Sequence, residues 1–409
     1  MPISPLANKQ ILLGVTGSIA AYKAVDLASK LAQSGAFVET ILTTDAARFV
    51  TPLTFQSVTG QPAYTDAELW GAEAHVLHVG LAQRADLLAI APITAQTMAK
   101  MAHGLADNLV TLAALAAHCP ILLAPAMDAG MFAHPTTQAN LRLLQERGAI
   151  VVGPEEGHLA SGLVARGRMT EPADLLGHIR YTLSRAGPLK GRKLVVTSGG
   201  TQEPLDPVRF ITNRSSGKQG VALAQAALDA GADVTLIAAP VSLPIPTGAR
   251  HLPVRTAADM ARAVLDACQD ADALLMAAAV ADFRPDQAAQ QKIKKQRALP
   301  ILTLQPTDDI LAAVARQRQD TGHPRVVVGF AAETQDLLPN ALSKLQAKAL
   351  DLIVANDVSA SDAGFQVDTN RVTLITPTGE PEALPLLSKA EVAARVIEKV
   401  IAQIPTDGD

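Results

Sequence analysis

The sequence predicts an α/β protein with two doubly wound parallel sheets, and three observations support this prediction. Short apolar runs alternate with helical patterns along the chain. Hydrophobic residues make up 48% of the 409 residues and aromatic residues only 3%, a balance typical of buried aliphatic strands covered by Ala-rich helices. The pattern restarts after AGPLKGRK, a basic linker at 186–193. We therefore expect one domain over 1–186 and a second over 190–409.

The first domain is expected to alternate strands and helices. Each strand is an apolar run that stops at a turn residue, and each helix has spaced apolar positions. The expected strands are 10–17, 37–43, 85–92, 120–127 and 149–154, and the expected helices are 18–35, 94–116 and 136–148. This order predicts a parallel, doubly wound sheet.

The second domain repeats the same logic with different local motifs, which argues against a recent internal duplication. The expected strands are 193–201, 233–240, 271–283, 325–334 and 352–358, followed by an edge strand at 371–379. The expected helices are 218–232, 256–270 and a terminal amphipathic helix at 390–404.

Composition excludes several classes of function. The net charge of −4 provides no field for non-specific binding of nucleic acid. Cys119 and Cys268 lie far apart and in no metal-ligand spacing, so we expect two buried free thiols and a reducing cytoplasm. The N-terminus has no signal-peptide pattern, and no uninterrupted apolar run is long enough to span a membrane.

Polar and small residues follow the strands of the first domain, where open α/β sheets bind ligands. Gly17 and Ser18 open a helix after the first strand, and free backbone N–H groups there favour an anion. Hydroxyl-bearing turns at 43–44 and 94–97 are expected at the same edge, a set that suits a mononucleotide such as FMN. Nearby, His75 and His78 are candidates for a general acid or base, with a weak metal pair as the alternative.

The second domain carries a long polar crossing, TSGGTQEPLDPVRFITNRSSGKQG at 197–220, inside an otherwise apolar sequence. Its final part opens a helix at Lys218 and predicts a phosphate site, although the spacing is not that of a P-loop. A basic run, QKIKKQR at 291–297, follows Asp282 at a strand end. This run is either a solvated face or a mobile cationic flap over a triphosphate.

These motifs resemble a known family. The segment GGTQEPLDPVRFITNRSSGKQG, with AAAVADFRP, KIKK, VGFAAET and LDLIVANDV in that order, resembles the signature of phosphopantothenate–cysteine ligases. The first half, with VTGSIAAYK, HVGLAQRADLLAIAPITAQT, GLADNL and PAMD, resembles flavin-containing cysteine decarboxylases. Together they look like the bacterial bifunctional phosphopantothenoylcysteine decarboxylase/phosphopantothenate–cysteine ligase of coenzyme A synthesis. That resemblance implies a flavodoxin-like N-terminal half and a Rossmann-like ligase half.

For the ligase half the resemblance implies CTP and Mg²⁺, with no Mg²⁺ ligands assigned. CTP activates the carboxylate of 4′-phosphopantothenate as an acyl cytidylate, and the amine of cysteine displaces CMP. Asn213 would hold the acyl cytidylate, and Lys292 in the basic run 291–297 would contact phosphates. The nucleotide would further contact Asp282, Thr307, Asp308, Asp309, Ile310, Phe330, Lys344 and Lys348.

For the first half the resemblance implies FMN, which oxidises the cysteine thiol so that CO₂ can leave. His78, and not His75, aligns with the family's catalytic histidine. The FMN would be held by Gly17, Ser18, Ile19, Thr43, Thr94, Ala95, Gln96 and Thr97.

Two positions depart from the family pattern. The family has Asn at the substrate-carboxylate site where this chain has Asp128, and an ionised carboxylate accepts hydrogen bonds but does not donate them. The family has a proton-donating Cys in the flap where this chain has Ser161, in the loop GHLASGLVARGRM at 157–169. A serine hydroxyl is a much weaker acid than a thiol. Asp128 would donate as Asn does only if burial kept it neutral.

Three hypotheses follow. The first is the full bifunctional enzyme. The second is an active ligase whose flavodoxin-like half is impaired or serves as a scaffold, and the third is a non-catalytic binding protein, against which the intact ligase motifs argue. By resemblance we also expect a homo-oligomer, a dodecamer built from flavin-domain trimers and ligase-domain dimers.

Overall fold

The computed structural model describes residues 4–70, 76–294, 301–333, 337–357 and 367–405. It divides into two compact units, one over Ser4–Leu183 and the other including Ser184–Asp409. Each unit has its own sheet and its own hydrophobic core. Among the described residues, no helix is long and apolar enough to cross a membrane.

The first unit contains a parallel sheet, as the sequence predicts, with six strands where five were expected, because β3 was not predicted. Its strands run in the order β3 (Ala63–Tyr64), β2 (Phe37–Leu42), β1 (Gln10–Val15), β4 (Leu87–Ile93), β5 (Ile121–Pro125) and β6 (Ile150–Val151). The order reverses direction between β1 and β4, which makes the carboxyl ends of these two strands the expected place for a ligand.

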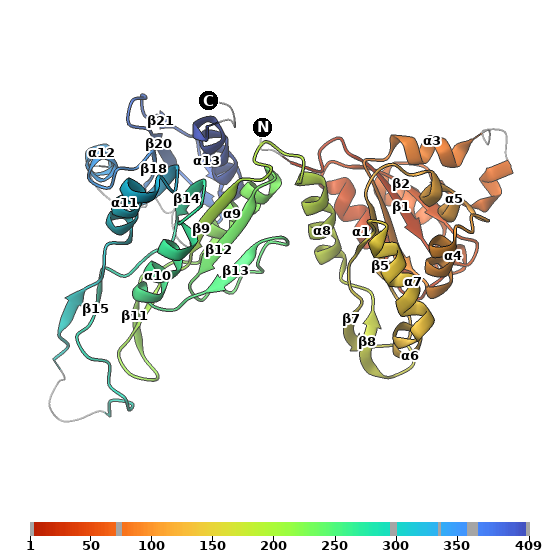
Figure 1. Cartoon of the computed structure of the whole chain (residues 1–409), viewed down its shortest axis with the longest axis horizontal. Helices are drawn as coiled ribbons and strands as arrows, with labels where there is room; N and C mark the ends of the chain where they lie inside the picture. Colours follow the sequence, from red (N-terminus) through yellow and green to blue (C-terminus); the bar gives the residue numbers. More distant parts are fainter. Residues whose placement is uncertain (1–3, 71–75, 295–300, 334–336, 358–366, 406–409) are drawn as a thin grey trace. The chain divides into compact units, whose positions relative to one another are not determined.

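Helices cover both faces of this sheet because side chains of a strand alternate between its faces. Leu13 and Val15 of β1 join one core, and Leu12 joins the other. The first core receives α1 (Ala21–Gln33), α2 (Pro52–Thr59) and α8 (Pro172–Ser184); the second receives α3 (Leu77–Arg84), α4 (Ala95–His103), α5 (Leu109–Ala116) and α7 (Pro135–Glu146). A hairpin of β7 (Glu155–His158) and β8 (Val164–Arg168) lies beside the short helix α6 (Ala129–Ala133) (Figure 1).

One predicted helix of the first unit is wrong in extent. The expected helix 94–116 is two helices, because Gly104 ends α4 in the left-handed region at φ +71°. Asn108 then begins α5 with a capping box, its side chain accepting from the N–H of Thr111 at 3.0 Å.

The second unit contains an eight-stranded sheet, with the first six strands parallel and the last two antiparallel. Its order is β13 (Arg250–Pro253), β12 (Asp233–Ala238), β9 (Lys193–Ser198), β14 (Ala273–Met276), β17 (Val326–Glu333), β18 (Leu352–Asp357), β20 (Val372–Ile375) and β21 (Glu382–Ala383). Three two-stranded pairs accompany it: β10 (Gln202–Pro204) with β11 (Phe210–Thr212), β15 (Phe283–Pro285) with β16 (Leu304–Pro306), and β19 (Thr369–Asn370) with β22 (Leu387–Ser388). The direction of the order changes between β9 and β14, so ligand chemistry is expected there.

The helices of the second unit pack on both sides of its sheet. α10 (Ala257–Ala267), α11 (Ile310–Thr321) and α12 (Leu337–Ala347) contribute to one core with the strands. α9 (Lys218–Asp229) and α13 (Lys389–Gln403) pack against each other. Cys268 is buried, as expected, and burial raises its pKa to about 12, whereas Cys119 is only half-buried.

Candidate functional sites

The first unit has a cavity of about 430 Å³ at the carboxyl ends of β1, β2 and β4. We call it the first cavity. It is lined by most of the residues that the sequence assigns to a flavin, namely Gly17, Thr43, Thr94, Ala95, Gln96 and Thr97. These residues come from three separate turns, and the parallel sheet brings the turns together at one edge.

The wall of the first cavity is held by hydrogen bonds between its turns. Thr16 Oγ1 donates to Pro92 O at 2.8 Å and accepts from the N–H of Thr94 at 3.0 Å. Thr94 Oγ1 in turn accepts from the N–H of Thr97 and begins α4. A Cβ atom on Gly17 would lie 2.5 Å from Asp45 Cβ, so only glycine fits there. The result is a close backbone approach beside hydroxyl and amide donors, a donor set that fits a flavin mononucleotide.

Charges around the first cavity are partly paired. Lys100 Nζ lies 2.8 Å from Asp107 Oδ2, and this hydrogen bond lowers the pKa of Asp107 below its usual range. Asp66 Oδ1 accepts from the N–H of Leu109 at 2.8 Å, at the start of α5. Lys100 is thus a cation held near the polar wall.

Three residues that the sequence assigns to this site lie outside the cavity wall. Ser18 Oγ accepts from the N–H of Ala20, and the side chain of Ile19 is 60% exposed. His78 lies in the first turn of α3, and its Nδ1 is buried with no hydrogen-bond partner among the described residues. A buried ring nitrogen with an unmet hydrogen bond is a candidate for contact with a bound molecule. His75 lies outside the described residues.

The two positions that depart from the family pattern contact each other. Ser161 Oγ donates to Asp128 Oδ2 at 2.7 Å, and the N–H of Gly130 donates to Asp128 Oδ1 at 2.9 Å. These two hydrogen bonds hold the pKa of Asp128 below its usual range. Asp128 is therefore ionised at neutral pH, and neutralisation by burial, the condition under which it would donate like Asn, is not met in this unit. Neither residue lines the first cavity.

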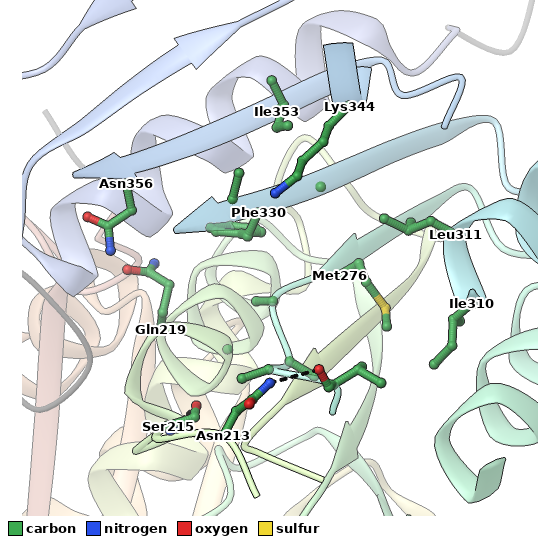
Figure 2. A pocket seen from close by; sticks show the side chains of 18 of the residues that line it. Asn213, Ser215, Gln219, Met276, Ile310, Leu311, Phe330, Lys344, Ile353 and Asn356 are labelled. Carbon is green, nitrogen blue, oxygen red and sulfur yellow. Dashed lines mark hydrogen bonds between the residues drawn. The ribbon is translucent and has the colours of Figure 1, made fainter. Parts of the chain in front are cut away.

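The second unit has a larger cavity of about 740 Å³, which we call the second cavity (Figure 2). It lies at the carboxyl ends of β14 and β17 and at the start of α9 and α11. The predicted residues that line it are Asn213, Asp282, Thr307, Asp308, Asp309, Ile310, Phe330, Lys344 and Lys348. Lys292 does not line it.

Two lysines at the end of α12 and just beyond it line one side of the second cavity. Lys344 lies in the last turn of α12 and Lys348 directly follows the helix, and in Figure 2 the Lys344 amine is directed towards Phe330. Lys348 Nζ pairs with Asp309, which begins α11 by accepting from the N–H of Ala312 at 3.0 Å. Burial opposes ionisation of Asp309, but the Lys348 hydrogen bond and the backbone N–H groups dominate and lower its pKa.

Asparagine side chains also line the second cavity, together with the cationic residues Arg214, Lys218 and Lys389. Asn213 Nδ2 donates to Val280 O at 2.9 Å, which places this side chain beside the turn after β14 (Figure 2). Asn356 and Asn370 also line the cavity, and the Oδ1 atom of each is buried with no hydrogen-bond partner among the described residues. The sequence interpretation did not single out these two amides, and only the spatial convergence of β18 with β19 reveals them.

A clamp joins the polar crossing to the basic run. Asp206 Oδ2 accepts from the N–H of Ile293 at 3.1 Å, and Arg209 Nη2 donates to Ile293 O at 2.8 Å. Asp206 also accepts from Arg209 Nε at 3.0 Å, so the two side chains hold each other. The residue next to Lys292 is thereby fixed on both backbone atoms. The sequence pointed to Asp206 and Arg209 as polar, but not to this partner; Lys295, Gln296 and Arg297 lie outside the described residues.

Among the residues that the structure describes, no group of three or more His, Cys, Asp or Glu side chains is placed to hold a metal ion. Asp282, Asp308 and Asp309 all line the second cavity without forming such a group.

Both units match family models. Residues 3–184 match the family described as Flavoprotein, and residues 189–404 match the DNA/pantothenate metabolism flavoprotein C-terminal domain. Among solved structures, the chain is similar to the C-terminal domain of coenzyme A biosynthesis bifunctional protein CoaBC at 35% identity, with a TM-score of 0.45, over 53% of this chain and 97% of that one. It is also similar to a mutant PPC decarboxylase complexed with pantothenoylaminoethenethiol, at 34% identity and a TM-score of 0.40, over 42% of this chain and 97% of that one.

The resemblance to curated relatives covers nearly the whole chain. The coenzyme A biosynthesis bifunctional protein CoaBC of Bacillus subtilis is 44% identical over 407 residues, which is 99% of both chains. The protein of the same name from Vibrio cholerae is 43% identical over 98% of this chain and 99% of its own, and that from Mycobacterium tuberculosis is 44% identical over 96% of each. Because these relatives are 43–44% identical over at least 96% of the chain, the chain belongs to the family of bifunctional coenzyme A biosynthesis proteins.

Proposed function

We propose that the two cavities serve two successive reactions of coenzyme A synthesis. The second cavity ligates 4′-phosphopantothenate to cysteine at the expense of CTP. The first cavity, with bound FMN, decarboxylates the phosphopantothenoylcysteine that results to 4′-phosphopantetheine. The observation that carries the proposal is the second cavity, because it collects every predicted nucleotide residue except Lys292.

The second cavity suits a nucleotide at one end and an acyl substrate at the other. Lys344 and Lys348 supply positive charge for the phosphates of CTP, and Phe330 offers a flat apolar face nearby. The turn from Thr307 to Ile310 supplies hydrogen-bonding groups for the cytosine. Mg²⁺ would accompany the triphosphate, and its ligands would come largely from phosphate and water.

The part of the second cavity lined by Asn213, Asn356 and Asn370 would hold the acid and the amine. Asn213, which donates to the Val280 carbonyl, would hold the acyl cytidylate while the amine of cysteine attacks and CMP leaves. The unpartnered Oδ1 atoms of Asn356 and Asn370 accept hydrogen bonds from donors on the substrates. Lys292 would approach the phosphates from the segment clamped by Asp206 and Arg209.

In the first unit, Gly17, Thr43 and residues 94–97 would hold the FMN phosphate and ring edge through backbone N–H groups and hydroxyls. Ser18 and Ile19 belong to the same turn as Gly17, and FMN would contact them only from the outer side of that turn. When bound, FMN supplies the oxidation of the substrate thiol that makes loss of CO₂ possible. His78 would hold or move a proton at its buried Nδ1.

A direct assay tests the ligase. Purified protein, given 4′-phosphopantothenate, cysteine, CTP and Mg²⁺, should release CMP and pyrophosphate and form phosphopantothenoylcysteine. Asn213→Ala should abolish this product. Absence of CTP-dependent CMP release from the unchanged protein would refute the proposal.

The alternative, an active ligase with a non-catalytic first unit, is not favoured, because relatives that carry the bifunctional name match both units. Supplied phosphopantothenoylcysteine separates the two. Formation of phosphopantetheine supports the bifunctional enzyme. Accumulation of an enethiol would place the defect at Ser161, and no release of CO₂ would place it at Asp128.

We also propose that the protein acts in the cytoplasm as a homo-oligomer, a dodecamer by resemblance. Large apolar side chains of the first unit support association, since Tyr22 is 63% and Leu53 68% exposed. Light scattering coupled to size-exclusion chromatography would give the mass, and a monomer would contradict this proposal.

A further inference from the structure

We propose that Asp128 and Ser161 act as one unit, in which Asp128 is a positioning residue whose carboxylate holds the tip of the flap against the turn after β5 through the Ser161 hydroxyl. The flap is defined as residues 155–168, the β7–β8 hairpin with its turn. Asp128 in this chain therefore does not bind the carboxylate of the substrate. This inference depends on the proposed decarboxylation in one respect only, namely that the flap covers the substrate of that reaction.

The base of the flap is fixed by the backbone. The N–H of Met127 donates to Gly167 O at 3.0 Å, and a Cβ atom on Gly167 would lie 2.3 Å from Met127 O. The guanidinium of Arg166 lies 5.2 Å from the ring centre of Phe132 in α6. These contacts keep β8 against the turn that contains Asp128.

The tip of the flap is held differently. Its own turn is closed by the N–H of Leu159 donating to Leu163 O at 2.8 Å and the N–H of Gly162 donating to Leu159 O at 2.9 Å. Among the described residues, the bond from Ser161 to Asp128 is the one hydrogen bond that joins this tip to the rest of the unit. The tip is otherwise exposed, with the Leu163 side chain 55% accessible.

The chemistry of the two side chains matches this role. Both carboxylate oxygens of Asp128 already accept, one from Ser161 and one from the N–H of Gly130. A carboxylate is a stronger acceptor than an amide, and a hydroxyl is a stronger donor than a thiol. The two departures from the family pattern therefore form one matched hydrogen bond, rather than two independent losses.

Hydrogen–deuterium exchange of the full-length protein, read by mass spectrometry on peptides from 158–165, tests the pair without any activity. Asp128→Ala and Ser161→Ala should each speed exchange of the tip about tenfold, the effect of losing one charge-assisted hydrogen bond. The double variant should show no further increase, because the same bond is lost. Ser161→Thr, which keeps the hydroxyl, should restore slow exchange.

Two controls keep this result interpretable. Peptides spanning the flap base and 120–127 should exchange at the same rate in every variant, which shows that the unit is folded. Leu163→Ala, at the same exposed tip, should leave exchange unchanged. Equal exchange in all variants, additive effects in the double variant, or an effect of only one of the two single variants would overturn the proposal.

Steady-state decarboxylation of phosphopantothenoylcysteine separates the flap role from substrate binding. If Asp128 holds only the flap, Asp128→Asn should leave KM unchanged or higher and lower kcat. If instead Asp128 faces the substrate carboxylate, Asp128→Asn should lower KM by removing a like charge, and this result would overturn the proposal. Absence of CO₂ from every protein, wild type included, would refute the proposed decarboxylation, while the exchange data still decide the flap contact.

Discussion

At the scale of single residues, the pair of Lys348 and Asp309 joins the wall of the second cavity to the start of α11. Lys348 lines the second cavity, and its side chain is partly shielded from solvent. Water therefore screens its charge less than it would on an open surface. Lys348→Met should lower kcat/KM for CTP roughly ten- to a hundredfold, the range for losing a charged hydrogen bond. Ligation rates over a series of CTP concentrations measure this. Lys399→Met, which removes a surface ion pair with Glu382, is the matched control and should leave kcat/KM for CTP unchanged.

The carboxylate of Asp206 should make the stability of the second unit depend on pH. The Arg209 side chain, together with backbone N–H groups, holds the pKa of Asp206 far below its usual range despite its burial. Because the folded pKa is depressed, the stabilising contribution is complete above the unfolded value of about 3.9 and is lost as pH falls through the folded value. The melting temperature of Asp206→Asn should thus lie below wild type at pH 7, and the gap should narrow below about pH 4.

Circular dichroism melts between pH 7 and pH 3 measure this difference. The exposed Asp320→Asn serves as the control and should follow wild type throughout. A gap that stays constant down to pH 3 would contradict the assigned cause.

At the scale of elements, the approach of β8 to the turn after β5 depends on Gly167. Replacement by Ala puts a methyl group 2.3 Å from Met127 O, so the strand or the turn must move. Gly167→Ala should destabilise the first unit by about 1–3 kcal/mol, the usual cost of overpacking. Chemical unfolding followed by flavin release measures it. Gly162→Ala, at the open tip, tests strain alone, because nothing lies near its Cβ position and only its positive φ of +84° opposes alanine.

The main parallel strands could be predicted from apolar runs, because a buried parallel strand needs little beyond Val, Ile and Leu; the sequence made no prediction of their order within each sheet. The break between α4 and α5 could not be predicted, because glycine also occurs inside helices. The left-handed conformation of Gly104 depends on the rest of the fold. Likewise, the expected strand 271–283 continues only to Met276 before the chain turns into the second cavity. The sequence is predominantly apolar on both sides of Met276, so composition alone does not mark the end of the strand.

The rule that ligands gather at strand ends predicted Thr94 at the edge that bears the first cavity, whereas Asp309 was expected at a binding site only through the family resemblance. Long-range partners could not be predicted from sequence. Asp128 with Ser161 are 33 residues apart, and Asp206 with Ile293 are 87 apart. No local pattern encodes such contacts, because they depend on how separate loops close over the sheet.

At the scale of the whole molecule, the two units should carry their reactions independently in one chain. Each has its own core, and the residues assigned to each reaction lie within one unit. Asn213→Ala should therefore abolish ligation yet decarboxylate supplied phosphopantothenoylcysteine at the wild-type rate. His78→Ala should do the reverse, forming phosphopantothenoylcysteine with CTP but no phosphopantetheine.

Mixing the two variants gives the sharpest form of this prediction. Because the intermediate can leave one active unit and enter another, the mixture should form phosphopantetheine from 4′-phosphopantothenate, cysteine and CTP. The rate should fall on dilution if the intermediate travels through solution. Failure of the mixture, with each variant active in its own remaining reaction, would mean that the intermediate passes only between units of the same chain.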